Sequence, residues 1–306
     1  MIMWLILAFL SAAFLGIYDS LKKKSLRDNA VLPVLFLNTL FSSLIFVPFI
    51  ILSHNGLLAD DSIFHVAQGT WHEHRYIVCK ALIVLSSWVL GYFGMKHLPL
   101  TIVGPINATR PVMVLVGALL LFGERLNLWQ WAGVLLAVAS FFLLSRSGRK
   151  EGIDFKHDRW IYMIVGAALL GALSGLYDKY LMAPQSEGGV GLDRMMVQSW
   201  YNLYQCVMML VMLLLLWWPK RRHTTPFRWD WAILGISLFL STADFLYFYS
   251  LSLPTAMISI VSMIRRGSVV VSFICGALFF HEKNLQAKAI DLALVLLGMI
   301  CLYIGS

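Results

Sequence analysis

Three arginines lie inside long apolar stretches of the sequence, where a charged side chain is costly. Arg110 is near the middle of one stretch, and the adjacent Arg265 and Arg266 are near the middle of another. At the centre of a membrane helix an arginine costs about 2.5 to 3.5 kcal/mol on insertion scales, so such residues mark functional sites. Because a guanidinium group holds a carboxylate or phosphate through two parallel hydrogen bonds, these residues predict a binding site for an anionic group.

The two arginine positions correspond to each other. Arg110 follows Pro99 by 11 residues, and Arg265 follows Pro254 by 11 residues, with a leucine before each proline. We therefore expect the same cation at the same depth in two related parts of the chain, facing a shared pocket. Successive helix residues point about 100° apart, so Arg265 and Arg266 are not expected to serve that pocket equally.

Internal ion pairing is an alternative role for the arginines. Asp244 and Asp291 also lie within apolar stretches and are the acidic residues best placed to pair with them. A buried pair of this kind can be structural or can set a conformation. Asp244 is also the better candidate for proton coupling, because a buried carboxylate that exchanges a proton for an arginine or a substrate links transport to a proton gradient.

Polar and aromatic residues elsewhere in the apolar stretches are expected to line the same pocket. They are Trp88, Tyr92, Asn107, Tyr201, Asn202 and Gln205. Asn107 precedes Pro111, whose ring displaces the Asn107 carbonyl from its helical hydrogen bond, and such a break is tolerated where the backbone faces a cavity. Aromatic packing and hydrogen bonding between helices are the alternative roles for these side chains.

A Gly-x-Tyr-Asp sequence closes two of the apolar stretches. It places Tyr18 and Asp19 at the end of one stretch, and Tyr177 and Asp178 at the end of the other. These four side chains are candidates for gating a central pocket. The alternative for the two carboxylates is an exposed position at the membrane surface.

No motif in the sequence predicts metal binding or catalysis. The four cysteines lie in apolar stretches without metal-ligand spacing, and the four histidines of residues 54–75 fit no metal pattern. The sequence contains no HExxH, GxSxG or phosphate-binding loop. We therefore expect no metal, no cofactor and no enzymatic activity, with an intramembrane enzyme as the alternative from another class.

Composition predicts an all-α integral membrane protein. Hydrophobic residues make up 59% of the 306 residues and charged residues only 13%, against about 25% in soluble domains. A helix crosses the bilayer with about 20 apolar residues. Ten transmembrane helices are expected, at residues 2–20, 30–53, 76–95, 98–123, 127–146, 160–180, 195–218, 229–251, 255–280 and 285–305.

Basic residues are concentrated in the loops that follow the odd-numbered stretches, as in 20–29, 147–159 and 219–228. The positive-inside rule therefore places these loops in the cytoplasm and both termini outside. The formal charge of +8 is explained by this pattern, so no nucleic-acid partner is expected.

An internal repeat divides the chain into two halves. Gly-x-Tyr-Asp, the Leu-Pro pairs and the sequences GALLLFGERL and GALFFHEKNL recur at offsets of 159, 155 and 159 residues. The halves are predicted at 1–146 and 158–306, joined by a basic cytoplasmic linker at 147–157. Because each half has five spans, the second enters the membrane from the opposite side, an inverted repeat typical of secondary transporters.

Ten spans in two five-helix halves, with GERL after the fourth span and HEKNL after the ninth, resemble the drug/metabolite transporter superfamily and within it the EamA-type proteins. The resemblance implies metabolite transport across a bacterial inner membrane by a monomer or homodimer. It matches the recurring acidic residue of the family to Glu124 and Glu282. The second copy departs from the pattern because His281 stands where the first copy has Gly123.

The expected function is therefore a secondary active transporter of a small polar metabolite, anionic or zwitterionic, by alternating access. Its expected partners are that small molecule, the lipid bilayer and protons as a candidate coupling ion. A translocase for a lipid or lipid-linked carrier is the alternative, and it would place the arginines at headgroup depth beside a lateral opening.

Overall fold

The fold was analysed in a computed structural model of the chain. The structure describes residues 2–110, 112–113, 127–149, 155–253, 261, 264–280 and 285–305. The predicted family acids Glu124 and Glu282 lie outside the described residues. Every regular element within those ranges is helical, which agrees with the predicted all-α class.

The helices follow the predicted order of apolar stretches. Their bounds are α1 Ile2–Leu26, α2 Val31–His54, α3 Trp71–His97, α4 Leu100–Ala108, α6 Leu128–Arg149, α7 Arg159–Met182, α8 Arg194–Met212, α9 Ala232–Ser252, α11 Ser268–Phe279 and α12 Leu285–Ile304. A 3-10 turn at Gln185–Glu187 precedes α8, and a π-helical turn at Leu213–Trp217 continues it.

Six helices of the described residues are long and apolar enough to cross a membrane. They are Met3–Leu26, Val31–His54, Trp71–His97, Arg159–Met182, Arg194–Trp217 and Ala232–Ser250. Many large apolar side chains on these helices face outward, for example Phe9, Leu44 and Leu82, each more than half exposed. Such a surface is stable in lipid and unfavourable in water. The remaining four spans stay predictions.

Local sequence sets where several helices begin. At the start of α3, Glu73 accepts hydrogen bonds from the Thr70 backbone nitrogen at 2.6 Å and from the Thr70 hydroxyl at 2.9 Å, a capping box. At the start of α8, the Asp193 carboxylate accepts from the Met196 backbone nitrogen at 2.8 Å. The capping box starts α3 at residue 71, five residues before the predicted span.

Both arginine-bearing segments contain a helix break. Helix α4 ends at Ala108, where the Thr109 hydroxyl donates to the Ile106 carbonyl at 2.7 Å. Helix α11 begins at Ser268, after a turn at Gly267. Arg110 therefore lies just after one break, and Arg265 and Arg266 lie just before the other.

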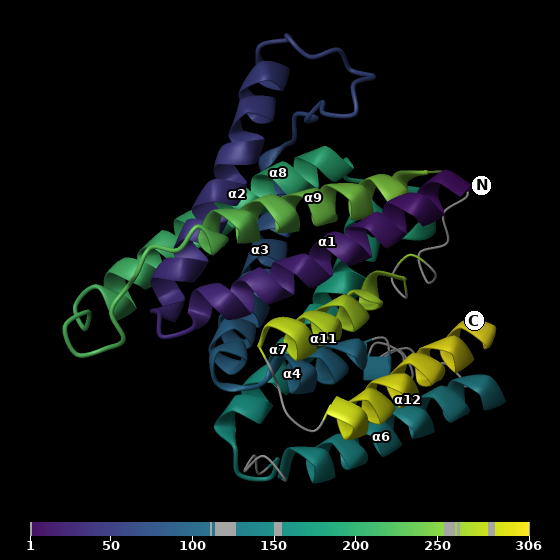
Figure 1. Cartoon of the computed structure of the whole chain (residues 1–306). Coiled ribbons are helices and arrows are strands. Elements are labelled where there is room, and N and C mark those ends of the chain that lie inside the picture. Colours follow the sequence, from purple (N-terminus) through teal and green to yellow (C-terminus); the bar gives the residue numbers. More distant parts are fainter. Residues whose placement is uncertain are drawn as a thin grey trace.

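The helix contacts repeat when the two halves are exchanged. Helix α1 packs on α9, while its counterpart α7 packs on α3. The counterparts α2 and α8 contact each other, as do α6 and α12. Figure 1 shows α6 and α12 side by side, and α1 beside α9. These are contacts that the predicted repeat leads us to expect.

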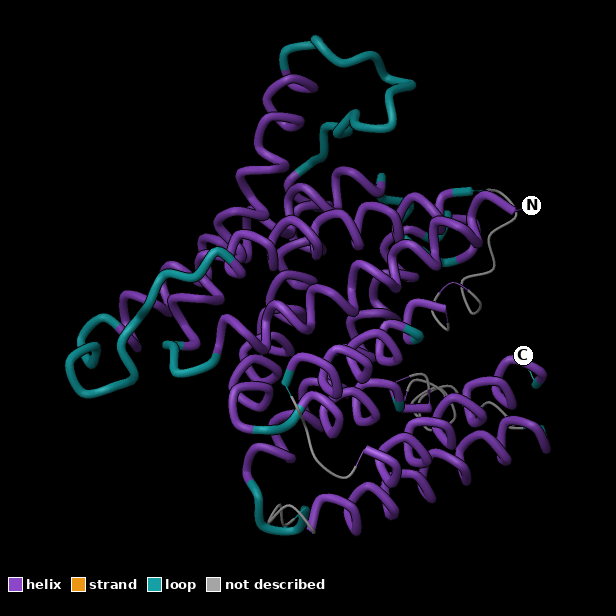
Figure 2. The backbone as a smooth tube through the Cα atoms, in the orientation of Figure 1, coloured by secondary structure: helices purple, strands orange, loops and turns teal. Residues whose placement is uncertain are grey.

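Two long loops extend from the helical body. Figure 2 shows residues 55–70, which join α2 to α3, and residues 218–231, which lead to α9, as extended loops at different ends of the molecule. The insertion of the two halves in opposite senses, their exact boundaries and the side on which each loop lies remain predictions.

Candidate functional site

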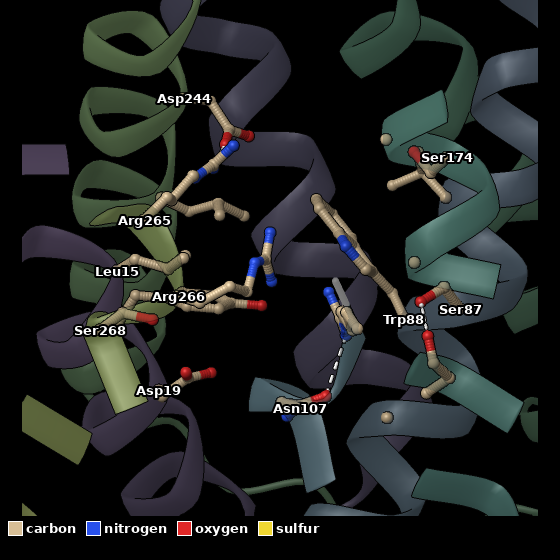
Figure 3. A pocket seen from close by; sticks show the side chains of 18 of the residues that line it. Leu15, Asp19, Ser87, Trp88, Asn107, Ser174, Asp244, Arg265, Arg266 and Ser268 are labelled. Atoms are coloured by element: carbon tan, nitrogen blue, oxygen red, sulfur yellow. Dashed lines mark hydrogen bonds and ion pairs between the residues drawn. The ribbon is translucent and has the colours of Figure 1, made fainter. Parts of the chain in front are cut away.

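A charged cavity of about 170 Å³ lies among helices α1, α3, α4, α7, α8, α9 and α11 (Figure 3). Five basic residues line it: Lys22, Lys80, Arg110, Arg265 and Arg266. Three acidic residues line it: Asp19, Asp178 and Asp244. With these groups in their ordinary charged forms, the described lining carries two positive charges more than negative ones.

Arg265 is paired with Asp244. The Arg265 guanidinium forms an ion pair with the Asp244 carboxylate of α9 and lies 4.1 Å from the centre of the Tyr247 ring. The Tyr201 hydroxyl of α8 donates to the same carboxylate at 2.9 Å. These contacts hold Arg265 at one side of the cavity, which is the internal pairing that the sequence left open.

Lys80 and Asp178 form a second ion pair, between α3 and α7. The ammonium group of Lys80 also lies 4.9 Å from the Tyr201 ring and 5.6 Å from the Phe248 ring. Tyr201 therefore contacts both pairs, since its ring faces Lys80 and its hydroxyl faces Asp244. The result is a continuous polar network across α3, α7, α8, α9 and the segment before α11.

Lys22 and Asp19 form a third pair, within α1, at 2.8 Å. Lys22 also donates to the Tyr18 hydroxyl at 3.3 Å and lies 5.2 Å from the Tyr92 ring. The Ser272 hydroxyl of α11 donates to Asp19 at 3.4 Å. Figure 3 shows Asp19 and Asp244 at opposite ends of the view, so the first and third pairs lie at opposite ends of the cavity.

Arg110 has no carboxylate partner among the described residues. Its Nη2 donates to the Asn107 side-chain oxygen at 3.0 Å, and its buried Nε makes no hydrogen bond there. The guanidinium lies against Gly171 of α7, because a Cβ atom on that glycine would come within 2.6 Å of the guanidinium carbon.

Arg266 also lacks a carboxylate partner within the described part of the chain. Its side chain extends between the two ends of the cavity in Figure 3. Arg110 and Arg265 both act on it as like charges. Arg265 and Arg266 therefore both reach the cavity, but only Arg265 is neutralised by a neighbour.

The structure brings most of the predicted site residues together. The cavity lining contains Tyr18, Asp19, Trp88, Tyr92, Asn107, Arg110, Asp178, Tyr201, Asp244, Arg265 and Arg266. Tyr177 is outside that lining: its hydroxyl donates to the Tyr76 carbonyl at 3.3 Å, and its ring packs on Tyr180. Asp291 is buried beside α6, where its carbonyl accepts from Ser140 at 2.8 Å.

Asn202 and Gln205 also lie outside the described cavity lining. The Ser43 hydroxyl of α2 donates to the Asn202 backbone carbonyl at 2.9 Å, and the Asn202 amide donates to the Gln198 carbonyl of its own helix at 2.8 Å. Gln205 is fully buried, with no hydrogen bond at either amide atom within the described structure. The predicted place of these two residues in the cavity lining is therefore wrong for the described structure, and among the contacts described only the Asn202 backbone links two helices.

Sequence reasoning missed three contributors to the cavity. Lys80 is a lone lysine within the predicted span 76–95. Because a charge within a span is costly, its position alone indicates a functional residue. Lys22 was assigned to a cytoplasmic loop, although it follows Asp19 by three residues, a spacing that allows an ion pair on one helix. Gly171 gave no signal, because its role depends on a side chain from another helix.

Metal binding finds no support in the described residues, where no three His, Cys, Asp or Glu side chains form a group suited to a metal ion. The cavity lining offers charged groups, hydrogen-bonding groups and aromatic surfaces for binding. Trp88 and Tyr92 of α3 supply aromatic surface, and Ser87 and Ser174 also line the cavity. The Ser87 hydroxyl donates to the Ala167 carbonyl at 2.7 Å.

Comparisons with known proteins show the fold and a family similarity in the first half of the chain. Among solved structures, 26 chains match. One of them, described as the crystal structure of a protein, has a TM-score of 0.63 at 14% identity, with 98% of this chain and 96% of that chain covered. At this identity the likeness shows a shared fold. No curated protein matches the sequence.

The model of the EamA-like transporter family matches residues 2–146. The matched segment includes Arg110, the Gly-x-Tyr-Asp sequence of α1 and the GERL sequence. Together with the long apolar helices, the match supports an integral multi-pass membrane protein of the transporter type. The match covers just under half of the chain and confirms the resemblance seen in the sequence to the EamA-type proteins of the drug/metabolite transporter superfamily.

Proposed function

We propose that this protein is a secondary active transporter that moves a small anionic metabolite across the membrane by alternating access. The observation that supports this proposal is the excess positive charge of the cavity lining. Arg110 and Arg266 both line the cavity, and neither has a carboxylate partner among the described residues. Leaving a buried cation uncompensated is unfavourable, so the cavity favours an occupant that supplies negative charge.

The role of each arginine follows from its contacts. Arg110 and Arg266 bind the anionic group of the cargo, and Asn107 orients Arg110 through its side-chain oxygen. Arg265 is held by Asp244 and serves the site as part of the surrounding network. In this proposal the anion is recognised by one arginine from each half of the chain.

The ion pairs give alternating access a physical basis. The Lys80–Asp178 pair joins α3 of the first half to α7 of the second, and the Ser272–Asp19 hydrogen bond joins α11 to α1. Both connections are formed in this structure, so opening one end of the cavity would require one of them to break while the other is kept. The exchange of equivalent helix contacts between the halves supports such a rocking movement.

Proton coupling is assigned to Asp244 in this proposal. The carboxylate accepts from Tyr201 and pairs with Arg265, so its protonation would release both partners at once. That single event would loosen the contact between α8, α9 and α11 at one side of the cavity. Protons are thus the proposed coupling ion.

Counterflow in proteoliposomes tests the transport proposal. Purified protein is reconstituted, and uptake of labelled carboxylates, phosphate esters and amino acids is measured with and without the same unlabelled compound inside. Alternating access predicts saturable uptake of an anionic compound, accelerated by internal substrate. Arg110→Gln and Arg266→Gln are each expected to weaken apparent affinity by about 10- to 100-fold, the effect of losing a hydrogen bond to a charged group.

Arg27→Gln is the matched control, because Arg27 is exposed in the turn between α1 and α2. It should leave uptake unchanged. Uptake without acceleration by internal substrate would argue against alternating access. Full uptake of the anion in both cavity variants would remove the proposed site, and flux confined to lipid-anchored compounds would favour the lipid translocase.

A further inference from the structure

The pairing of charges inside the cavity limits the kind of anion that fits. Each of the three lining carboxylates is engaged by a basic residue: Asp19 by Lys22, Asp178 by Lys80 and Asp244 by Arg265. A zwitterionic cargo would bring an ammonium group that needs a carboxylate. No lining carboxylate of the described structure is left to receive it.

Two guanidinium groups remain after this pairing, and they repel each other. Arg110 makes a neutral hydrogen bond to Asn107 and packs on Gly171, while Arg266 receives repulsion from both Arg110 and Arg265. A single negative charge would compensate one guanidinium and leave the other buried and unpaired. Two negative charges compensate both.

The rest of the lining, as far as the structure describes it, contributes no further net charge. The wall opposite Arg266 in Figure 3 contains Trp88, Ser87 and Ser174, which are uncharged. The cavity thus has one cationic region with two unpaired charges and one neutral region with aromatic and hydroxyl groups. The neutral region suits an uncharged remainder of the cargo.

We propose that the cargo carries two negative charges, as a phosphate monoester or a dicarboxylate, bound jointly by Arg110 and Arg266. The inference rests on the proposed function and narrows it from anions in general to dianions. It assigns Asp244 the task of keeping Arg265 out of the binding set, so that the site carries two positive charges and not three.

Matched pairs of small molecules test this inference. Phenyl phosphate and phenyl sulfate share size and ring but carry two charges and one charge near neutral pH. Succinate and succinamate differ in the same way, and comparing succinate with phenyl phosphate separates two carboxylates from one phosphate. The measurement is thermal stabilisation of the detergent-purified full chain, titrated with each compound.

Each dianion is expected to bind about 10- to 100-fold more tightly than its monoanionic partner at pH 7.5. Because the second pKa of a phosphate ester is about 6, phenyl phosphate should lose that advantage at pH 5. Phenyl sulfate keeps its single charge throughout and reports any effect of pH on the protein itself. This comparison uses the wild-type chain and needs no variant to fold.

Arg110→Gln and Arg266→Gln provide the second measurement, with Arg27→Gln as the control. Each cavity variant should bind phenyl phosphate and phenyl sulfate with similar affinity, because one unpaired guanidinium remains. Equal affinity of the wild type for phenyl phosphate and phenyl sulfate would overturn the inference. If both arginine variants then bound these anions more weakly than the wild type, the proposed arginine site would still stand. Failure of all four compounds to stabilise the wild type would also overturn it.

Discussion

The guanidinium carbon of Arg110 lies 2.6 Å from the point where a Cβ atom on Gly171 would stand. Arg110 follows α4 in the first half, and Gly171 is part of α7 in the second. The absence of a side chain at Gly171 therefore creates the space in which this arginine reaches the cavity. The position of the cation in one half depends on a glycine in the other.

Gly171→Ala is expected to weaken anion binding without removing any charge. The added methyl group would push the Arg110 guanidinium away from α7 and disturb its hydrogen bond to Asn107. We expect an affinity for phenyl phosphate reduced about tenfold, measured by ligand-dependent thermal stabilisation.

Gly175→Ala is the matched control for that variant. Gly175 lies one turn further along α7 and also lines the cavity, but a Cβ atom there would meet no heavy atom within 4 Å. Binding should stay at the wild-type level. Equal losses in the two glycine variants would show that the effect comes from the α7 backbone and not from Arg110.

Asp244 and Arg265 are expected to show strong energetic coupling. Removing one partner of a buried ion pair leaves an uncompensated charge, which costs about 3 to 5 kcal/mol. Asp244→Asn and Arg265→Gln should each lower the unfolding temperature of the purified protein, and the double variant should lose less than the sum of both. A coupling energy of about 1 to 3 kcal/mol is expected, and strict additivity would refute it.

Reversing the charges of the Lys80–Asp178 pair should restore transport lost in the single variants. Lys80→Asp and Asp178→Lys each place like charges together between α3 and α7. The double variant recreates the attraction in the opposite direction. We expect counterflow uptake to fall at least tenfold in each single variant and to recover in part in the double variant. Lack of any recovery would mean that the lysine has another role at this position.

Gln205→Leu is expected to be neutral or stabilising. Both amide atoms of Gln205 are buried without a hydrogen bond within the described structure, and an unsatisfied buried group costs about 1 to 3 kcal/mol. Asn202→Leu removes the hydrogen bond to the Gln198 carbonyl within α8 and should lower stability by about 0.5 to 1.5 kcal/mol. Thermal unfolding in detergent compares them, and a large loss in Gln205→Leu would point to a role beyond packing.

Cysteine labelling tests the predicted membrane orientation. Asp61 and His223 are exposed in the two long loops, 55–70 and 218–231. The positive-inside prediction places the first loop outside and the second in the cytoplasm. In a background without the four native cysteines, an impermeant maleimide should label Asp61→Cys in intact cells and His223→Cys only after permeabilisation. Labelling of both in intact cells would contradict the predicted orientation.

Sequence alone determined the membrane character of this chain, the order of its helices and many of the residues that line its cavity. The physical reason is the apolar interior of the bilayer. A helix needs about 20 apolar residues to cross it, so a long apolar stretch predicts a span. A charged side chain within such a span is energetically costly and therefore indicates a functional role. Arg110, Arg265 and Asp244 could thus be identified from their places in apolar stretches, and the corresponding positions of the two arginines followed from the repeat.

Only the tertiary structure decided which of these charges neutralise one another. Asp244 reaches Arg265 from another helix, Asp178 reaches Lys80 across 98 residues of sequence, and Gly171 makes room for Arg110. Such pairings depend on how helices cross and rotate against each other, which residue spacing along one helix does not specify. The same packing placed Asn202 and Gln205 outside the described cavity lining and left Arg110 and Arg266 as its unpaired cations among the described residues.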